Sequence, residues 1–516
     1  MRRHVLLLAA GRRRRHALRR WGLVLFAALL VSAEARVVAA PAVGAIAQLH
    51  REGRWLVDQF GRVVIVHGVN LVWKRAPYVP PDTAEGFTAA DAAWLAQHGF
   101  NGARIGTLWA GVTPTAPGVV DPTYLDRWDR VVGQLAANQI WTQFDFHQDQ
   151  WNEIYGGEGA PNWAVQRPAP FDSLPPITPE FPWGYWTPEQ AVLWDNFWAN
   201  DAGVQDAWAA ALQAVARRWR DQPYSMGYDV LNEPWAGTEY ADCAITGCAE
   251  HYRTELQPAM ERARAAIRQV DPTGLIWYEP QQLASGRDVA TFYGPVGDEQ
   301  IGYSWHNYCP QIFLQSQGLP VTDVEPCADY SNQAHRRALE QGDRMGAVAM
   351  MSEFGATDSV RALAIDTAAA DRNFTSWMHW SYKTWNDPTT ADTNQGLFVS
   401  DGDLDSVKTG KLRTLVRTYP QATAGIPRSL SFDSETGQFH YTYDPRPSDA
   451  PTEIFVSPLH YPNGAQITVD GGRATSPGRD NRIQITADGS GPVSVVIHDC
   501  GATHYVVCGP AVASAG

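Results

Sequence analysis

The chain is short of positive charge: its 516 residues hold 41 Lys and Arg against 55 Asp and Glu, a net charge of −14 at pH 7. Eight of the arginines fall within residues 1–35 beside a single Glu, so the remainder of the chain carries a net charge of −21. A strongly acidic surface repels phosphate backbones. We therefore expect no nucleic-acid partner. No nucleotide-binding glycine loop and no Ser-His-Asp order stands out either.

Cysteine is scarce, with six residues that form three local couples: Cys243 and Cys248, Cys309 and Cys327, and Cys500 and Cys508. No couple has a second Cys pair or a His pair nearby at zinc-finger spacing, which argues against a metal site. The acidic stretch DGDLDSVKTG at Asp401 lacks the Gly and the terminal Glu of an EF-hand calcium loop. We expect three short-loop disulfides of an exported chain and no bound metal.

The N-terminal region lacks an apolar run long enough to cross a bilayer. Between Gly22 and Ala33 lie about a dozen apolar residues, whereas a membrane-spanning helix needs roughly 20. This stretch follows the eight arginines and ends at Ala33-Glu34-Ala35, the small-x-small form that signal peptidase accepts. We expect residues 1–35 to be a cleaved export signal rather than a membrane anchor, and the mature protein to be secreted.

Aromatic and apolar residues are plentiful, with 44% apolar content, 21 Trp and 35 Pro, as in a globular protein with a large core. From residue 63 to about 418, eight β-rich runs alternate with amphipathic segments, an order typical of a (β/α)8 barrel. We assign the barrel to residues 45–424. The runs are VVIVHGVNL, NGARIGTLW, WTQFDFHQD, MGYDVLNEP, LIWYEP, IGYSWHNY, AVAMMSEFG and SWMHWSYK.

Two stretches depart from this alternation. Residues 427–516 show alternating apolar and polar residues with turns between them, which predicts a small antiparallel β-sandwich domain. Residues 150–200, after the third run, form an insertion rich in aromatics, and loops of this length are usually functional. We expect at least half of its large apolar side chains to be buried, and the remainder to form a lipid-contacting patch. These side chains are Trp163, Phe171, Leu174, Phe181, Trp183, Tyr185, Trp186, Trp194, Phe197 and Trp198.

Two glutamates follow buried strands at positions that bring them together. Glu233 in DVLNEPW ends the fourth run, and Glu353 in MMSEFGAT ends the seventh. Active sites of such barrels lie at the C-terminal ends of the strands, so both carboxylates face the same opening. Glycoside hydrolysis needs such a pair, one acid to protonate the leaving oxygen and one carboxylate to attack the anomeric carbon. This mechanism requires no cofactor. The alternative for each residue is a solvated or salt-bridged carboxylate.

Motifs from Arg104 to Lys383 resemble glycoside hydrolase family 5, whose acid/base follows strand four and whose nucleophile follows strand seven. The resemblance makes Glu233 the acid/base and Glu353 the nucleophile of a retaining enzyme. It also implies a supporting shell, with ordinary packing or hydrogen-bonding roles as the alternative for each member. That shell comprises Arg104, His147, Asn232, His306, Tyr308 and Trp380.

A narrower resemblance is to the endoglycoceramidase branch, which cleaves between oligosaccharide and ceramide. It is carried by NLVWKRAPY, DFHQDQWNE, GGEGAPNWAV, DNFWAN, GYDVLNEPWAG and SEFGATD. It implies that Lys74, His147 and Asp149, with Trp380 or Trp385, bind the glucose next to the scissile bond. The chain departs from the pattern at residues 150–152, and relatives that prefer galactosyl or steryl linkages share much of it.

Three functions therefore remain open. The first is a secreted hydrolase of lipid-linked glycans, with a glycan or glycolipid substrate and transient contact with a membrane surface. The second is a polysaccharide hydrolase such as a β-glucanase or mannanase, and the third is a carbohydrate-binding protein without activity. The presence of both carboxylates favours a hydrolase. Oligomeric state and the role of the C-terminal domain cannot be read from the sequence.

Overall fold

The computed structural model describes residues 47–286, 289–316, 319–389, 394–475, 477–478, 480–489, 491–499 and 506–508. The expected export signal at residues 1–35 and the expected bond between Cys500 and the Cys508 side chain lie outside the described part. Within the described part, no helix combines the length and apolar character that crossing a bilayer requires.

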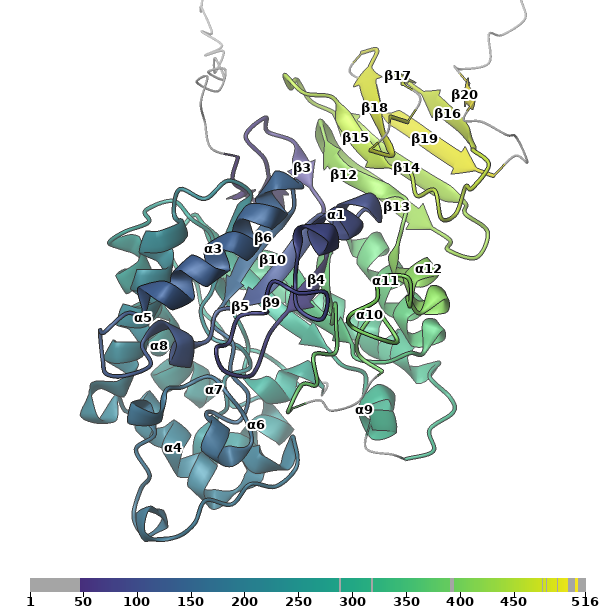
Figure 1. The fold of residues 1–516 in the computed structure, drawn as a ribbon. Coiled ribbons are helices and arrows are strands. Elements are labelled where there is room, and N and C mark those ends of the chain that lie inside the picture. Colours follow the sequence, from purple (N-terminus) through teal and green to yellow (C-terminus); the bar gives the residue numbers. More distant parts are fainter. Residues whose placement is uncertain are drawn as a thin grey trace, which may run out of the picture. The chain divides into compact units, whose positions relative to one another are not determined.

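Eight parallel strands close into a barrel, one from each predicted run, so the predicted fold class is confirmed (Figure 1). Around the barrel the order is β10-β11-β4-β5-β6-β7-β8-β9. The strands are β4 (His67–Leu71), β5 (Gly102–Gly106), β6 (Trp141–Asp145), β7 (Ser225–Asp229), β8 (Ile276–Tyr278), β9 (Ile301–Asn307), β10 (Val348–Gly355) and β11 (Ser376–Trp380).

The helices between the strands carry the expected apolar faces. In α3 the side chain of Asp121 caps the first turn by accepting from the Thr123 and Tyr124 amides, and Pro122 starts the helix. Buried side chains then recur at helical spacing against the barrel. The helices are α1 (Ala89–Gln97), α2 (Trp109–Val112), α3 (Pro122–Ala137), α4 (Pro188–Trp198), α5 (Val204–Trp219), α6 (Tyr240–Thr246), α7 (Ala249–His251), α8 (Gln257–Arg268), α9 (Pro310–Ser316), α10 (Pro326–Met345), α11 (Val360–Asn373) and α12 (Thr409–Leu415).

An apolar cluster closes the end of the barrel at which the strands begin. It contains Val66, Met226, Trp277, Met350 and Met378, each fully buried. Buried polar groups therefore gather toward the other end, where the strands terminate. In Figure 1, α4, α6 and α9 lie at the barrel end that faces away from the C-terminal strands. The active-site opening belongs to this end of the barrel.

The C-terminal region forms two sheets, as predicted, but one of them recruits strands from the start of the chain. In the seven-stranded sheet the order is β1-β2-β3-β12-β15-β18-β17, and in the five-stranded sheet it is β13-β14-β19-β16-β20. The strands are β1 (His50–Glu52), β2 (Trp55–Val57), β3 (Val63–Val64), β12 (Tyr419–Thr423), β13 (Gly425–Phe432), β14 (Phe439–Pro445), β15 (Thr452–Phe455), β16 (Gln466–Asp470), β17 (Gly472–Ala474), β18 (Arg482–Ala487), β19 (Val493–His498) and β20 (Val506–Cys508).

This recruitment divides the first predicted run. Its first two residues form β3, which pairs antiparallel with β12, and the barrel strand β4 begins only at His67. A buried ion pair between Arg417 and Asp371 joins the start of the C-terminal sheets to α11. The sheets therefore pack against the barrel through charged as well as apolar contacts.

Candidate active site

The two predicted catalytic glutamates meet at the mouth of the barrel. Glu233 follows β7 and Glu353 lies in β10, and both are buried, with 8% and 4% of their surface exposed. One carboxylate oxygen of each and a ring nitrogen of His306 lie within 4.8 Å of one another. Carboxyl groups about 5 Å apart suit a retaining glycosidase, whereas an inverting enzyme needs room for a water between them.

Glu353 is held by donors on both oxygens. Arg104 Nη1 donates to Oε1 at 2.6 Å, and the Tyr308 hydroxyl donates to Oε2 at 2.7 Å. Burial raises the pKa of Glu353, and the cations of His306 and Arg104 oppose that rise. Burial and the neighbouring Glu353 raise the pKa of Tyr308 well above its usual value, which keeps this hydroxyl a donor. The arrangement presents an aligned carboxylate to the opening.

Arg104 is the hub of the site and has no exposed surface. It lies within 3.2 Å of oxygens of four carboxylates and donates to Asn232 Oδ1 at 2.9 Å. Burial lowers the pKa of Arg104, but the carboxylates, Asp145 first, outweigh burial and raise it well above its usual value. The four carboxylates belong to Asp145, Asp229, Glu279 and Glu353.

Glu233 is fixed at its side chain and at its main chain. His306 Nδ1 lies 2.7 Å from Oε1, and Gln282 Nε2 donates to Oε2 at 3.0 Å. The backbone has φ = 43°, in the left-handed region that side chains other than glycine rarely adopt. The Glu233 amide donates to Glu279 Oε2 at 2.8 Å, and Gln148 Nε2 donates to the Glu233 carbonyl at 3.0 Å.

A second charged group lies on the side predicted to bind the sugar. Lys74 Nζ donates to Asp149 Oδ2 at 2.6 Å and lies 4.6 Å from the centre of the Trp380 ring. His147 stacks on the same indole, with ring centres 5.5 Å apart, and its Nε2 is 3.5 Å from Asp149. The structure thus brings together Lys74, His147, Asp149 and Trp380, the residues that the resemblance assigned to the sugar site.

The protonation of this group follows from its charges. Burial lowers the pKa of Lys74, but Asp149, Asp387 and Glu158 outweigh burial and raise it well above its usual value. Burial also lowers the pKa of His147, and the Asp145 contact overcomes this and raises it to about 10. His147, Asp149 and Glu158 have the spacing of metal ligands. The Lys74 ammonium already lies 2.6 Å from Asp149 and 3.6 Å from Glu158, so a cation occupies this position.

The last predicted sugar-site residue, Trp385, stands apart from this group. Its ring meets Trp73 edge-on, with centres 5.6 Å apart, and its Nε1 donates to the Glu85 carbonyl at 2.7 Å. It is linked to the group through the chain, since Asp387, two residues on, lies 3.3 Å from Lys74 Nζ.

Sequence reasoning missed several acids that complete the site. Glu279 follows β8 in LIWYEP, which is the same placement after a strand that singled out Glu233. Glu158 lies in the quoted GGEGAPNWAV stretch, and both of its carboxyl oxygens are buried without a hydrogen-bond partner. Burial and the neighbouring Asp149 raise the pKa of Glu158, although Lys74 opposes them. Nothing in the sequence pointed to Asp387 as a site residue except its position after the eighth strand.

The aromatic insertion, defined as residues 150–200, overhangs the acid/base side of the mouth. Tyr185 and Trp186 pack on Trp235, two residues after Glu233, with ring centres 5.2 and 5.0 Å away. Of the ten large apolar side chains, Tyr185, Trp194, Phe197 and Trp198 are buried. Trp163 and Phe181 are partly buried and packed against the same core, so more than half of the ten contribute to core packing. Leu174, Trp183 and Trp186 are 52%, 50% and 37% exposed.

Two of the three predicted disulfides are formed in the structure, Cys243–Cys248 and Cys309–Cys327. The first joins α6, which comes after β7, to the residues just beyond that helix, and the second joins the segment after β9 to α10. Both therefore brace connections at the mouth of the barrel.

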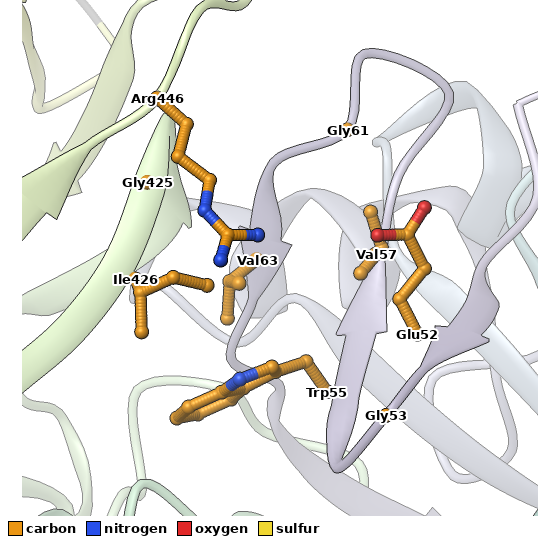
Figure 2. Close-up of a pocket in the computed structure, with 9 residues that line it drawn as sticks. All are labelled: Glu52, Gly53, Trp55, Val57, Gly61, Val63, Gly425, Ile426 and Arg446. Atoms are coloured by element: carbon orange, nitrogen blue, oxygen red, sulfur yellow. The ribbon is translucent and has the colours of Figure 1, made fainter. Parts of the chain in front are cut away.

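A separate hollow of about 300 Å³ lies between the N-terminal strands and β13. Figure 2 shows the Trp55 indole along one side and the Arg446 guanidinium directed into it. Val63, Ile426 and Glu52 line the remainder. None of the predicted site residues belongs to its lining, so this hollow is distinct from the carboxylate site.

Comparisons with known proteins agree with the geometry. Residues 57–386 match a family model described as Cellulase (glycosyl hydrolase family 5), and residues 417–497 match the glycoside hydrolase family 5 C-terminal domain. Endoglycoceramidase I of Rhodococcus hoagii is 36% identical over 460 residues, 88% of each chain. Endoglycoceramidase of Cyanea nozakii is 30% identical over 458 residues, 81% of this chain and 86% of the relative. The solved structure of endo-glycoceramidase II from Rhodococcus sp. superposes with a TM-score of 0.70 at 26% identity, covering 86% of this chain and 99% of the other.

Proposed function

Because the chain belongs to glycoside hydrolase family 5 and is a glycoside hydrolase, we propose that it cleaves the bond between a glycan and a lipid, as found in glycosphingolipids. The observation that carries this proposal is the pair of buried glutamates within 4.8 Å, in a chain similar to endoglycoceramidases over 88% of its length. The N-terminal sequence supports secretion, which would place the enzyme where glycolipids are exposed.

The proposed reaction proceeds by double displacement. Glu353 attacks the anomeric carbon while Glu233 donates its proton to the oxygen of the departing lipid, which leaves a glycosyl ester on Glu353. Glu233, now a carboxylate, takes a proton from water, and the resulting hydroxide displaces Glu353 from the sugar. Two inversions at the anomeric carbon restore its configuration. The 4.8 Å approach of the two carboxylates supports this retaining course.

The sugar next to the bond would lie against Trp380, with Lys74, His147 and Asp149 reaching its hydroxyl groups. The flat C–H face of a pyranose stacks on an indole, and buried charged groups recognise hydroxyls strongly. Asn232 Oδ1 is engaged by Arg104 and one amide hydrogen by the Gln148 carbonyl. Its second amide hydrogen can donate to a sugar 2-hydroxyl, a contact that strengthens in the transition state.

The lipid side is supported by where exposed apolar side chains occur. Among the described residues, four of the twelve large hydrophobic side chains that are exposed lie in the aromatic insertion. Exposed apolar side chains gathered in one segment mark a surface that contacts lipid or membrane. We therefore place the lipid beside the aromatic insertion and expect transient contact with a membrane surface. The twelve side chains are Val119, Leu174, Ile177, Trp183, Trp186, Ile245, Phe292, Phe313, Leu314, Leu319, Val360 and Val399.

Product analysis tests the proposal. The enzyme is incubated with glucosyl, lactosyl, galactosyl and ganglioside-type lipids, with steryl glucoside, and with β-glucan and mannan. Release of an intact glycan together with free ceramide supports the proposal and identifies the sugar. Cleavage of polysaccharide alone would make the chain a β-glucanase or mannanase, and release from steryl glucoside or galactosyl lipid alone would reassign the substrate. Binding without any product would leave a carbohydrate-binding protein.

A further inference from the structure

Glu279 is a buried acid that no motif singled out, and it contacts the machinery of the site at three points. It follows β8 and is 1% exposed. Its Oε1 accepts from Arg104 Nη2 at 2.7 Å and lies 3.3 Å from His306 Nε2, while its Oε2 accepts from the Glu233 amide at 2.8 Å. Burial raises the pKa of Glu279, but His306 and Arg104 outweigh burial and lower it to about 2. Glu279 is therefore a carboxylate at neutral pH.

The first link runs through the main chain of Glu233. A left-handed conformation at a residue other than glycine is strained, and it persists only when its surroundings hold it. The Glu279 carboxylate receives the amide hydrogen of this strained residue, and Gln148 holds its carbonyl from the other side. A charge-assisted bond of this kind is stronger than a neutral one. Glu279 thereby fixes the direction in which the Glu233 side chain leaves the backbone.

The second link runs through the ring of His306. Its Nε2 faces Glu279 and its Nδ1 faces Glu233, 2.7 Å from Oε1. Burial lowers the pKa of His306, but Glu279 and Glu353 outweigh burial and raise it well above its usual value. The ring is therefore an imidazolium whose Nδ1 is within hydrogen-bond distance of Glu233, while its Nε2 faces the Glu279 carboxylate as an ion pair at 3.3 Å. The attraction of Glu279 for this charge holds the ring from behind. One carboxylate thus sets both the backbone and the side-chain contact of Glu233.

We propose that Glu279 is the positioning residue for proton transfer by Glu233, holding its strained backbone directly and its carboxyl group through His306. This inference rests on the proposed function, in which Glu233 is the acid/base. The competing role is that of a counter-charge for Arg104, which would support the whole site without favouring any one step. The two roles predict different dependence on the leaving group.

Glu279→Gln separates these roles with little change in volume. A glutamine oxygen can serve the Glu233 amide or the donors of Arg104 and His306, whereas its NH₂ group faces an N–H donor at the other position. The variant is compared with Glu233→Gln as a reference for lost acid catalysis. Asp58→Asn is the control, because Asp58 is also a buried carboxylate in an ion pair, with Arg62 at 2.8 Å, and it lies beside the N-terminal strands rather than at the barrel mouth.

Two substrates are used, a lactosyl lipid and the 2,4-dinitrophenyl glycoside of the same sugar. The dinitrophenolate leaves without a proton, so kcat/KM for this compound does not require the general acid, whereas departure of the lipid alkoxide does. For Glu279→Gln we expect kcat/KM on the lipid to fall by about 100-fold or more, the lower range for general acid catalysis. We expect the dinitrophenyl glycoside to keep most of its kcat/KM. Added azide should raise kcat on that compound for both Glu233→Gln and Glu279→Gln.

The panel distinguishes failure of the inference from failure of the proposed function. Suppose that Glu233→Gln loses kcat/KM mainly on the lipid, whereas Glu279→Gln loses kcat/KM equally on both substrates. Glu279 is then only a counter-charge, and the inference is overturned. If Glu233→Gln itself loses kcat/KM equally on the two substrates, the proposed acid/base role of Glu233 is wrong, whatever Glu279→Gln shows. Glu279→Asp retains the charge but shortens its reach, and it should show an intermediate selectivity. It provides the same comparison if the Gln variant does not fold, and Asp58→Asn should show no selectivity.

Discussion

Two regions meet at the barrel mouth and are built differently. We call one the charged floor: Arg104 with Asp145, Asp229, Glu279 and Glu353. In the floor, oxygens of four carboxylates lie within 3.2 Å of the central Arg104 cation. The aromatic insertion, residues 150–200, instead leaves Trp183 and Trp186 half to one-third exposed and packs by ring contacts. The floor depends on individual partners, whereas the insertion depends on the total apolar area it offers.

This difference indicates how each region responds to the loss of one side chain. Removal of one member of the floor leaves buried charges without a counterpart, which affects stability and chemistry together. Removal of one ring from the insertion subtracts some apolar area and leaves the remaining rings in place. Loss of the central cation, Arg104, should therefore lower stability and activity on every substrate, whereas variants in the insertion should lower activity on the lipid substrate only.

The largest effect is expected for Arg104→Met. The variant leaves buried carboxylates unpaired, and breaking a buried ion pair costs roughly 3–5 kcal/mol. The free energy of unfolding in urea should fall by this amount, and activity should fall on every substrate. Arg428→Met is the control, since Arg428 forms an exposed ion pair with Asp444, and its unfolding midpoint should stay at the wild-type value. Equal unfolding midpoints for the two variants would contradict the claim that the buried ion pairs of Arg104 stabilise the fold more than an exposed ion pair does.

A second prediction concerns a buried acid outside the floor. Asp366 accepts from Asn307 Nδ2 at 2.8 Å, and burial raises its pKa from 3.8 to about 7 against the opposing hydrogen bonds of Ser331 and Asn307. An acid with a raised folded-state pKa contributes stability that is complete below its unfolded pKa and is lost as pH rises through the folded value. Wild-type stability should therefore fall between about pH 4 and pH 7 because of this group.

Asp366→Asn removes this titration. Its free energy of unfolding relative to wild type should rise by roughly 1.4 kcal/mol for each pH unit within that window and level off above it. Urea unfolding at a series of pH values measures the difference. A difference that does not change with pH would show that folding leaves the pKa of Asp366 at its ordinary value.

The smallest effect is expected in the insertion. Replacement of Trp183 and Trp186 by Ala should raise KM for a glycolipid by about fourfold for each lipid methylene left uncovered, since one buried CH₂ is worth about 0.8 kcal/mol. KM for an aryl glycoside and the unfolding midpoint should remain unchanged. Trp55→Ala is the control, because this Trp lines the hollow of Figure 2 rather than the mouth. Equal increases in KM on both substrates would mean that the insertion serves the sugar site or the fold.

The pair of catalytic glutamates could be predicted because parallel strands bring their C-terminal ends to one place. Glu233 and Glu353 both follow apolar runs, so the barrel geometry alone places them together. Glu279 follows a strand in the same way, but a single acid without a recognised motif is indistinguishable in sequence from a solvated one. Its role depends on the backbone of Glu233 and the ring of His306, contacts between distant segments that sequence does not display.

Two features could not be predicted from sequence: which rings of the insertion are exposed, and which strands pair at the edges of the sheets. Composition identified the aromatic residues near the mouth, but which rings are exposed depends on packing against Trp235 and its neighbours. The pairing of β3 with β12 joins residues more than 350 positions apart, and nothing local in the first apolar run marks its division into two strands. Periodicity predicts which segments are strands, whereas partners are selected by the assembled fold.

Covalent trapping tests the central claim most directly. A 2-deoxy-2-fluoro glycoside with a dinitrophenyl leaving group slows both steps but favours accumulation of the glycosyl-enzyme, because the good leaving group speeds its formation. Peptide mapping by mass spectrometry should locate one glycosyl group on Glu353, and Glu353→Gln should remain unlabelled. A label on any other residue, or turnover of the compound with inverted configuration and no trapped ester, would contradict the two-glutamate retaining mechanism.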